Sequence, residues 1–501
     1  MHSSLALVGA TRRGLLAVRG KAQMVYTLTD LFCGAGGSGL GATSVPGVEL
    51  VMAANHSPRA IETHSLNFPG AEHDCADISQ VEPRRYRSTD ILWASPECTN
   101  HSIAQGRKKS YGPDENGETL SADVAQRSRS TMWDVPRFAE VHRYQAVIVE
   151  NVVDAAKWPP FHAWLGAMDS LGYDHQIVSL NSMFAPAVNA PRAPQSRDRM
   201  YVVFSRKGNR RPDLDIRPVA WCPTCEQEVH AVQSWKPGRT VGRYRQQYAY
   251  RCPRFAKCKT VVEPYAEPAS SVIDFDLPAQ RIGDRQKPLS PKTMARIAIG
   301  LEKYVFPQLV PAGGSWNDGT TPVTDPFRTR TTRESEGLLV PVEGRDGKQA
   351  FPTWNPMRTQ TARAETALVV PYYRTVVARP ATHPMPTMTT VDRAALAFVA
   401  ELRGGGSKAR SVRDPLATVC ANGNHHMLVE PTLPPTVEDC RFRMLAVKEI
   451  QAAMAFTSSY VITGTKREQV RQLGNGVTPP AAEFLVERVI LSLGPSTPAE
   501  C

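Results

Sequence analysis

Three stretches of the chain place reactive side chains at the ends of short apolar runs. Cys98 follows the run at residues 90–94 and opens a long polar loop, so it is a poor match for the buried structural position that isolated cysteines commonly take. A thiolate there can act as a nucleophile. Glu150 ends a second run, and Arg197 and Arg199 are spaced to lie on the same face of a strand. Each charged residue alone is more often a surface group, but together they offer a nucleophile, a carboxyl group and two cations.

A glycine-rich turn follows the first apolar run. Residues 30–41 read Asp-Leu-Phe-Cys-Gly-Ala-Gly-Gly-Ser-Gly-Leu-Gly and lie between an expected strand and an expected helix. Glycines there let the backbone approach a nucleotide-like cofactor closely, although a tight packing turn is the alternative. One strand later, Asn55 and His56 stand where a polar residue can reach a ribose. Asp77 and Ile78 then offer an acceptor and an apolar wall for an adenine.

Four of the ten cysteines gather within 37 residues. Cys222 and Cys225 form a Cys-x2-Cys pair, and Cys252 and Cys258 form a Cys-x5-Cys pair whose spacing is wider than usual. We find no convincing secretory signal and therefore expect a reducing compartment, in which metal binding is favoured over disulfides. The two pairs predict a zinc site made of two knuckles, with His230 as a less favoured substitute ligand.

The positive charge of the chain is concentrated in one segment. Of 501 residues, 59 are Lys or Arg and 48 are Asp or Glu, a formal net charge of +11. Residues 192–260 hold sixteen of the basic and five of the acidic residues, which equals that whole excess. Such a block favours a contact surface for a polyanion, with a solvated basic face as the alternative. The segment interleaves aromatic residues with arginines, as nucleic-acid surfaces often do, at Trp235, Arg243, Tyr244, Arg245, Tyr248, Tyr250 and Arg251.

Short apolar runs alternate with longer polar or helical stretches between residues 26 and 204. These runs predict strands at residues 25–32, 48–53, 90–94, 146–149 and 200–204. The alternation predicts a mainly parallel sheet covered by helices, in which ligands bind beyond the carboxyl ends of the strands. No apolar run approaches the ~18 residues that span a bilayer, so we expect no membrane partner.

A degenerate repeat precedes the last part of the chain. Each copy has a turn-former, a proline, an apolar residue and then threonines at alternate positions, at residues 325–331, 355–361, 383–389 and 414–420. This pattern predicts short strands with hydroxyls on one face, which could bind phosphates or bases or could simply be solvated. The apolar spacing at residues 480–493 predicts a helix.

These motifs, in this order, resemble the cytosine-C5 DNA methyltransferase family. The resemblance covers residues 26–204 and 443–493. The glycine-rich turn is similar to the family's S-adenosylmethionine loop, and Cys98 to its nucleophile. The family's Glu-Asn-Val, Gln-x-Arg-x-Arg and late Gly-Asn motifs are matched by residues 150–152, 195–199 and 472–477.

The resemblance implies an α/β protein with a Rossmann-like methyltransferase sheet, a small zinc-ribbon insert and a β-rich target-recognition domain. We expect a disordered extension at residues 1–24, a catalytic S-adenosylmethionine-binding domain at 25–208, a basic insert with structural zinc at 209–265, a recognition region with repeats of about 30 residues at 266–432, and a return to the catalytic domain at 433–501. The spaced arginines of the extension also suit an organelle presequence, which is the less favoured alternative.

The implied reaction adds a thiolate of Cys98 to C6 of cytosine and thereby turns C5 into a nucleophile. Glu150 would protonate or hydrogen-bond N3, Arg199 would hold O2, and Arg197 would support the site. The implied cofactor contacts are Phe32, Gly34, Gly36, Gly37, Asn55, His56, Asp77, Ile78, Pro96 and Asn475.

The implied substrate is a cytosine flipped out of duplex DNA. The polar loop at residues 99–130 would close over the DNA through Arg107 and Lys108, with Ser102 on a phosphate. Arg243, Arg245 and Arg251 are the further DNA contacts that we predict. We expect a cytoplasmic, nucleoid-associated, monomeric enzyme of bacterial or phage origin, acting alone or beside a separate restriction endonuclease. A tRNA cytosine-C5 methyltransferase and a catalytically impaired DNA-binding protein are the alternatives.

Three residues depart from the family's pattern. Glu97 stands where proline usually precedes the nucleophile, Thr99 replaces the usual glutamine after it, and Asn55 replaces a ribose-binding glutamate. Glu97 brings a second carboxylate beside Cys98, which would raise the thiol pKa or accept a proton. The resemblance therefore predicts the fold more firmly than it predicts the catalytic rate or the cofactor affinity.

Overall fold

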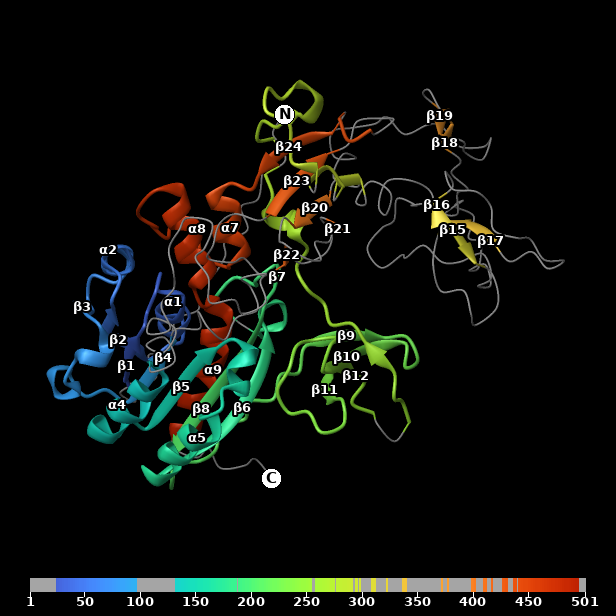
Figure 1. Cartoon of the computed structure of the whole chain (residues 1–501). Helices are drawn as coiled ribbons and strands as arrows, with labels where there is room; N and C mark the ends of the chain where they lie inside the picture. The colour runs from blue at the N-terminus through green and yellow to red at the C-terminus, as the bar shows by residue number, and fades with distance from the viewer. Residues whose placement is uncertain are drawn as a thin grey trace, which may run out of the picture.

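A seven-stranded sheet forms the centre of the computed structural model (Figure 1). Its order is β3-β2-β1-β4-β5-β8-β6. The bounds are Tyr26–Leu31 for β1, Val48–Asn55 for β2, Glu72–Cys75 for β3, Ile91–Ala94 for β4, Ala146–Asn151 for β5, Tyr173–Asn181 for β6 and Asp198–Arg206 for β8. Strands β1 to β5 run parallel, whereas β8 runs antiparallel to both β5 and β6. The predicted, mainly parallel sheet is confirmed, and each of the five predicted strands is present.

The structure describes residues 24–96, 131–186, 188–254, 257–274, 276–291, 293–295, 297–298, 436–438 and 440–494, together with short strands between residues 308 and 430. The predicted nucleophile and the predicted contacts of the DNA-closing loop lie outside the described residues; these are Cys98, Ser102, Arg107 and Lys108. Residues 1–23 of the predicted extension and the first three repeat copies also lie outside them.

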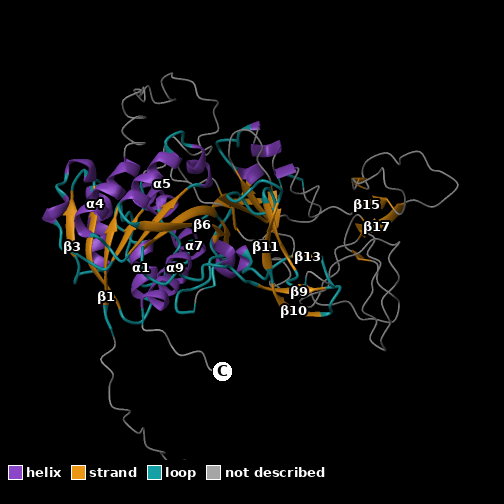
Figure 2. Ribbon diagram, turned by 90° about the horizontal axis from the view of Figure 1, so that it is seen from below, coloured by secondary structure: helices purple, strands orange, loops and turns teal. Residues whose placement is uncertain are grey.

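Helices cover both faces of the sheet (Figure 2). Along β5, Val147 and Val149 pack toward the helices α4, Asp134–His142, and α5, Phe161–Ser170. Ala146 and Ile148 face the opposite layer, which contains α1, Gly37–Thr43, and α9, Pro479–Leu493. The unbroken apolar run at residues 146–149 of β5 is explained by this burial on two faces, since neighbouring side chains of a strand point to opposite sides.

The end of the chain packs on its beginning. Helix α9 lies against α1, and a Cβ atom on Gly41 would come within 2.1 Å of the Pro479 carbonyl oxygen. Helices α7, Val447–Ala453, and α8, Lys466–Asn475, form a smaller core that also takes in Ala35 of the glycine-rich turn. The helix predicted at residues 480–493 is confirmed by α9. Among the residues that the structure describes, no helix has the length and hydropathy that a membrane span requires.

A small all-β insert follows the central sheet. Its strands are β9 at Val219–Cys222, β10 at Gln227–His230, β11 at Val232–Trp235, β12 at Tyr248–Arg251 and β13 at Val261–Val262. They form a hairpin of β9 and β10 and a three-stranded sheet in the order β11-β12-β13. The two parts share a core with Met183 and Phe184, which lie in the 3-10 helix directly after β6.

Further short strands occupy the next part of the chain. They are β14 at Gln280–Arg281, β15 at Gln308–Pro311, β16 at Thr321–Pro322, β17 at Glu336–Leu339, β18 at Pro371–Tyr372, β19 at Val376–Val377, β20 at Phe398–Glu401, β21 at Ala409–Ser411, β22 at Leu416–Ala417, β23 at His426–Glu430 and β24 at Arg441–Met444. One sheet has the order β14-β24-β23-β20-β21, so the domain boundary predicted at residue 432 falls between two paired strands. Strand β22, from the last repeat copy, pairs in parallel with β7, Gln195–Ser196.

Candidate active site

The glycine-rich turn connects β1 to α1 above a buried carboxyl group. Asp30 has no exposed surface, and its Oδ2 accepts a 2.6 Å hydrogen bond from Ser38 Oγ, while its Oδ1 has no partner among the described residues. Burial raises the pKa of Asp30 to about 7 against the lowering effect of the bonds from Ser38 and the Gly39 amide. Asp30 therefore fixes the first turn of α1 from below.

The glycines of this turn are needed for different physical reasons. Gly34 has a φ of +53°, and among the residues that the structure describes a Cβ there would meet nothing closer than the Phe32 carbonyl oxygen at 4.0 Å, which leaves room beside it. A Cβ on Gly36 would come within 2.3 Å of Tyr460 Oη, and one on Gly37 within 1.9 Å of the Val477 carbonyl oxygen. The packing alternative thus accounts for Gly36 and Gly37, and open space for a ligand lies at Gly34.

The other predicted cofactor contacts lie along the carboxyl edge of the parallel strands. Asn55 ends β2, and its Oδ1 accepts a 2.9 Å hydrogen bond from the Ser57 amide before α2, Pro58–Asn67. His56 is exposed beside it, and the exposed Asp77 follows β3 and accepts from the Ser79 amide at 3.1 Å. Ile78 is 1% exposed and packs in the main core, so its side chain offers an adenine little surface.

A buried ion pair lies at the ends of two neighbouring strands. Arg199 Nε is 2.8 Å from Glu150 Oε1, and both side chains are almost fully buried. Asn151, the next residue of β5, donates from Nδ2 to the Pro96 carbonyl oxygen at 3.4 Å. Pro96 stands two residues before Cys98, so the backbone that leads to Cys98 is held next to the residue that follows Glu150.

Arg197 is the most deeply buried charged group of this region, with 1% exposure. Its Nη2 donates to the carbonyl oxygens of Gly474 and Gly476 at 3.1 and 2.9 Å. These residues flank Asn475, which is exposed at the end of α8. Arg197 therefore ties the Gln-x-Arg-x-Arg stretch to the late Gly-Asn turn. Gln195 is fully buried, and neither of its amide atoms has a partner among the described residues.

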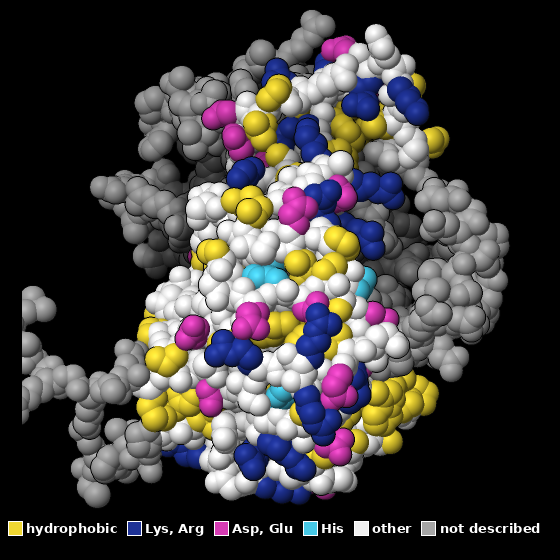
Figure 3. Space-filling view, turned by 90° about the vertical axis from the view of Figure 1, so that its left-hand side faces the viewer, with side chains coloured by type: hydrophobic (Ala, Val, Ile, Leu, Met, Phe, Trp, Pro, Cys, Tyr) yellow, Lys and Arg dark blue, Asp and Glu magenta, His cyan; other side chains and the backbone are white. Residues whose placement is uncertain are grey.

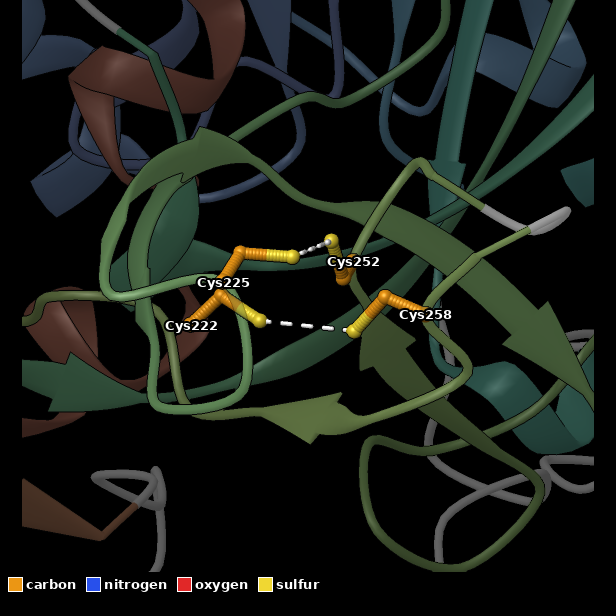
Figure 4. Close-up of side chains that lie close together, drawn as sticks. All are labelled: Cys222, Cys225, Cys252 and Cys258. Atoms are coloured by element: carbon orange, nitrogen blue, oxygen red, sulfur yellow. Dashed lines mark hydrogen bonds between the residues drawn. The ribbon is translucent and has the colours of Figure 1, made fainter.

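Four thiols of the insert converge on one point (Figure 4). The Sγ atoms of Cys222 and Cys258 are 3.6 Å apart, those of Cys225 and Cys252 are 3.8 Å apart, and all four lie within 4.8 Å of one another. Tetrahedral zinc with Zn–S bonds of about 2.3 Å requires sulfur separations of about 3.8 Å, whereas a disulfide requires about 2.0 Å. The donor set and its spacing therefore fit a tetrathiolate metal site, and His230 lies outside it.

Three tyrosines of the insert are core residues. Tyr244, Tyr248 and Tyr250 are 7%, 2% and 0% exposed and pack with Phe184 and the cysteines. The interpretation of these rings as an interleaved nucleic-acid surface is wrong for the three tyrosines. A buried tyrosine and a base-stacking tyrosine give the same sequence pattern, because both need a large ring with one polar end.

The three predicted DNA-contacting arginines of the insert have partners within the protein. Arg243 forms an ion pair with Asp154, which lies in a 3-10 helix directly after the Glu-Asn-Val stretch. Arg245 pairs with Glu263 Oε2 at 2.8 Å and lies over the Tyr244 ring. Arg251 donates to Ser234 Oγ at 3.2 Å and to the Lys259 carbonyl oxygen.

Two acidic residues near the Glu150–Arg199 pair escaped the sequence reasoning. Asp198 Oδ1 accepts a 3.0 Å hydrogen bond from the Tyr244 amide, and burial raises the pKa of Asp198 to about 6 despite the neighbouring cations. Burial would also raise the pKa of Asp154, but Lys157 and Arg243 outweigh it and hold that pKa below its usual value. The feature of the sequence that could have drawn attention to Asp198 is its position between Arg197 and Arg199.

Comparison with known proteins gives one family. Residues 26–265 match a family model described as C-5 cytosine-specific DNA methylase. The Type II methylase M.HgiEI of Herpetosiphon aurantiacus is 30% identical over 185 residues, which are 36% of this chain and 37% of that protein. The Type II methyltransferase M1.ScrFI of Lactococcus lactis subsp. cremoris is 28% identical over 187 residues, 36% of this chain and 42% of that protein. The matched region thus spans less than half of these curated relatives.

Solved structures give a weaker likeness. The S. pombe Dnmt2 methyltransferase aligns over 93% of this chain and 99% of its own, with a TM-score of 0.44 and 10% identity. The Entamoeba histolytica methyltransferase EhMeth aligns over 94% of this chain and 100% of its own, with a TM-score of 0.42 and 11% identity.

Proposed function

Because residues 26–265 belong to the C-5 cytosine-specific DNA methylase family, we propose that the protein is a DNA (cytosine-5-)-methyltransferase acting on duplex DNA. The observation that carries this proposal is the buried pair of Glu150 and Arg199 beside the backbone that leads to Cys98. A guanidinium can donate to O2 of a cytosine, and a carboxyl group in its protonated form can donate to N3, so the two groups suit the two acceptors on this edge of the base.

The reaction begins at C6 of a cytosine that has left the base stack. The Cys98 thiolate forms a bond to C6, and the C5–C6 electron pair moves to C5, which takes the methyl group. Glu150 hydrogen-bonds or protonates N3 while negative charge develops in the ring, and Arg199 holds O2. Loss of the proton from C5 and departure of the thiolate restore the aromatic base. Arg197 acts through its hold on the Gly474 and Gly476 carbonyls and so supports the site.

S-adenosylmethionine would supply an electrophilic methyl sulfonium at the edge of β1, β2 and β3, and after loss of the methyl group it would leave as S-adenosylhomocysteine. The open space beside Gly34 fits close approach of a ligand to the backbone. Around it we place Phe32, Gly36, Gly37, Asn55, His56, Asp77, Ile78, Pro96 and Asn475, with Gly36 and Gly37 contributing backbone only. Asn55 offers a neutral amide to a ribose hydroxyl, so we expect a weaker hold there than a glutamate gives.

A structural zinc ion held by Cys222, Cys225, Cys252 and Cys258 is part of the proposal. The insert has a small core, and a metal would supply part of its folding free energy. Metal analysis of the purified protein tests this directly. One zinc per chain, lost in the Cys252→Ser variant, is the expected result, and a metal-free protein that keeps its fold would contradict it.

Duplex DNA would contact Ser102, Arg107 and Lys108 of the loop after Cys98 and Arg245 and Arg251 of the insert. We assign Arg243 a different role below. We further propose a monomeric, cytoplasmic and nucleoid-associated protein of bacterial or phage origin that works alone or beside a separate restriction endonuclease. The two relatives described above, a Type II methylase and a Type II methyltransferase, support the last point.

The test incubates the protein with duplex DNA of mixed sequence and labelled S-adenosylmethionine and maps the product by bisulfite sequencing. We expect 5-methylcytosine at a defined sequence with the wild-type protein and none with Cys98→Ser. Label that enters tRNA and no DNA would support the alternative tRNA methyltransferase. Sequence-specific DNA binding without transfer to either nucleic acid would support the impaired, binding-only alternative.

A further inference from the structure

One loop of the insert touches the catalytic domain at several points. The insert loop, residues 236–247, connects β11 to β12. Within it, Arg243 pairs with Asp154, whose side chain is 7% exposed, and the Tyr244 amide donates to Asp198 Oδ1. The Gly242 amide donates to Ser179 Oγ of β6 at 3.2 Å. These contacts are directed inward, since the Arg243 side chain is itself only 27% exposed.

Both carboxylates that the insert loop touches lie close in sequence to one member of the Glu150–Arg199 pair. Asp198 directly precedes Arg199 on β8, and Asp154 follows Asn151 and Val152 on the segment that leaves β5. The guanidinium of Arg199 donates a 3.0 Å hydrogen bond to the Asp198 carbonyl oxygen as well as pairing with Glu150. A movement of the insert loop would therefore displace the backbone at Asp198, directly before Arg199, and at Asp154, shortly after Glu150.

The tetracysteine site fixes the other end of the same hairpin. Cys252 directly follows β12, and β12 is paired with β11 through Tyr248, Tyr250 and Arg251. Tyr244 and Tyr250 pack edge-on against Phe184 at 4.9 and 5.3 Å between ring centres. The cysteines thus anchor a short, rigid β-ribbon whose far end is the insert loop.

We propose that the insert braces the active site, with Arg243 and Asp198 as positioning residues that hold Glu150 and Arg199 in their paired geometry. The inference rests on the proposed methyltransferase function. It assigns the metal site a role in the methyl-transfer step, beyond any contact between the insert and DNA. It also replaces the prediction that Arg243 is a DNA contact, because its charge is directed to a buried carboxylate.

The first experiment separates catalysis from DNA binding. Arg243→Met and Arg243→Lys are compared with Arg217→Met, a control that removes an arginine paired with the exposed Asp213 and Asp215 in the same basic segment. For each variant, the single-turnover methylation rate at saturating DNA and S-adenosylmethionine is measured beside the DNA Kd. Arg243→Gln replaces Arg243→Met if the latter does not fold.

Arg243→Met should lower the single-turnover rate on the order of tenfold, since small displacements of catalytic groups have effects of this size. Its Kd should change by less than about threefold, because one paired arginine contributes little to phosphate binding. Arg243→Lys should recover most of the rate, because it keeps a cation of the insert loop beside Asp154 in addition to Lys157, and Arg217→Met should match the wild type. A Kd effect with an unchanged rate, or a Lys variant no better than Met, would overturn the proposal.

The second experiment needs no methylation activity. Amide hydrogen exchange is followed in the peptides that cover residues 153–157 and 198–201, in the zinc-loaded protein, after zinc chelation and in the Arg243 variants. Faster exchange after chelation and in Arg243→Met, with none in Arg217→Met, supports the brace. Unchanged exchange overturns it. A wild-type protein that methylates no DNA but shows the exchange pattern would refute the proposed function and leave the brace standing.

Discussion

At the scale of single residues, the buried carboxyl group of Asp30 makes the stability of the protein depend on pH, although it contacts no expected ligand. Asp30 lies beneath the cofactor turn with no exposed surface and one oxygen without a partner among the described residues. Its hydrogen bonds with Ser38 and the Gly39 amide hold the start of α1, yet burial keeps the pKa near 7. The charged form is therefore costly in the folded state, and the stability of the turn depends on pH.

Asp30→Asn should remove that pH dependence. Since the pKa is raised from 3.8 to about 7 in the folded protein, the stability that Asp30 contributes is complete below pH 4 and is lost as the pH rises through 7. Relative to the wild type, the variant should become more stable between pH 5 and pH 8 by up to about 3 kcal/mol, because the loss continues over the two units from pH 5 to the folded pKa of about 7 at roughly 1.4 kcal/mol per unit. Urea unfolding of both proteins at the two pH values measures the difference, and parallel pH profiles would contradict it.

Single residues also show which side-chain contacts could not be predicted from the sequence. The sequence placed Glu150 at a strand end, and the family resemblance gave Glu150 and Arg199 roles on the same base; the structure pairs them at 2.8 Å. The orientation of Arg243 was out of reach, because its partner Asp154 is 89 residues away and carries no motif of its own. Which charges become ion pairs is decided by tertiary contacts, whereas strand-end placement is decided by local pattern.

At the scale of elements, helix α1 is short and glycine-rich because another helix lies on it. Gly41 faces the Pro479 carbonyl oxygen, the Ala482 side chain and the Glu483 amide of α9. A side chain at this position has no free volume, since the nearest neighbours are backbone atoms that cannot rotate away. The contact joins two segments that are more than 400 residues apart in the chain.

Gly41→Ala should therefore destabilise the protein by about 1–3 kcal/mol or more, through overpacking of the α1–α9 contact. Gly166→Ala is the matched control, because Gly166 is also in a helix, α5, but a Cβ atom there would meet nothing within 4 Å. The control should be neutral or stabilised by up to about 1 kcal/mol from helix propensity. Thermal or urea unfolding compares the two, and equal effects would refute the packing argument.

The elements that the sequence predicted are those with a strong apolar run. Strand β3 reads Glu-His-Asp-Cys and has no such run, so only its pairing with β2 makes it a strand. The reversed direction of β8 was equally hidden, because the apolar pattern of a buried strand is the same in both directions. Connections, rather than side-chain patterns, set strand direction.

At the scale of the whole molecule, ion pairs balance part of the basic excess. Within residues 192–260, Arg199, Arg217, Arg243 and Arg245 pair with acidic side chains, and Lys207 pairs with Asp169 at 2.8 Å. The face shown in Figure 3 likewise intersperses Lys and Arg with Asp and Glu. A count of charges along the sequence therefore overstates the field that DNA would meet.

Two exposed cations of the insert loop add to the DNA contacts proposed above. Lys236 and Arg239 lie exposed in the insert loop and form no ion pair with any acidic side chain that the structure describes. If both contact phosphates, their joint replacement by glutamine should flatten the slope of log K against log salt by up to about 1.8, since each contact contributes about 0.9. The double variant Lys207→Gln with Arg217→Gln removes the same charge from groups that are already paired and should leave the slope nearly unchanged. Fluorescence anisotropy with a DNA duplex over a salt series measures both. Equal slopes for the two double variants would mean that net charge alone sets DNA affinity, and that this face of the insert has no particular part in it.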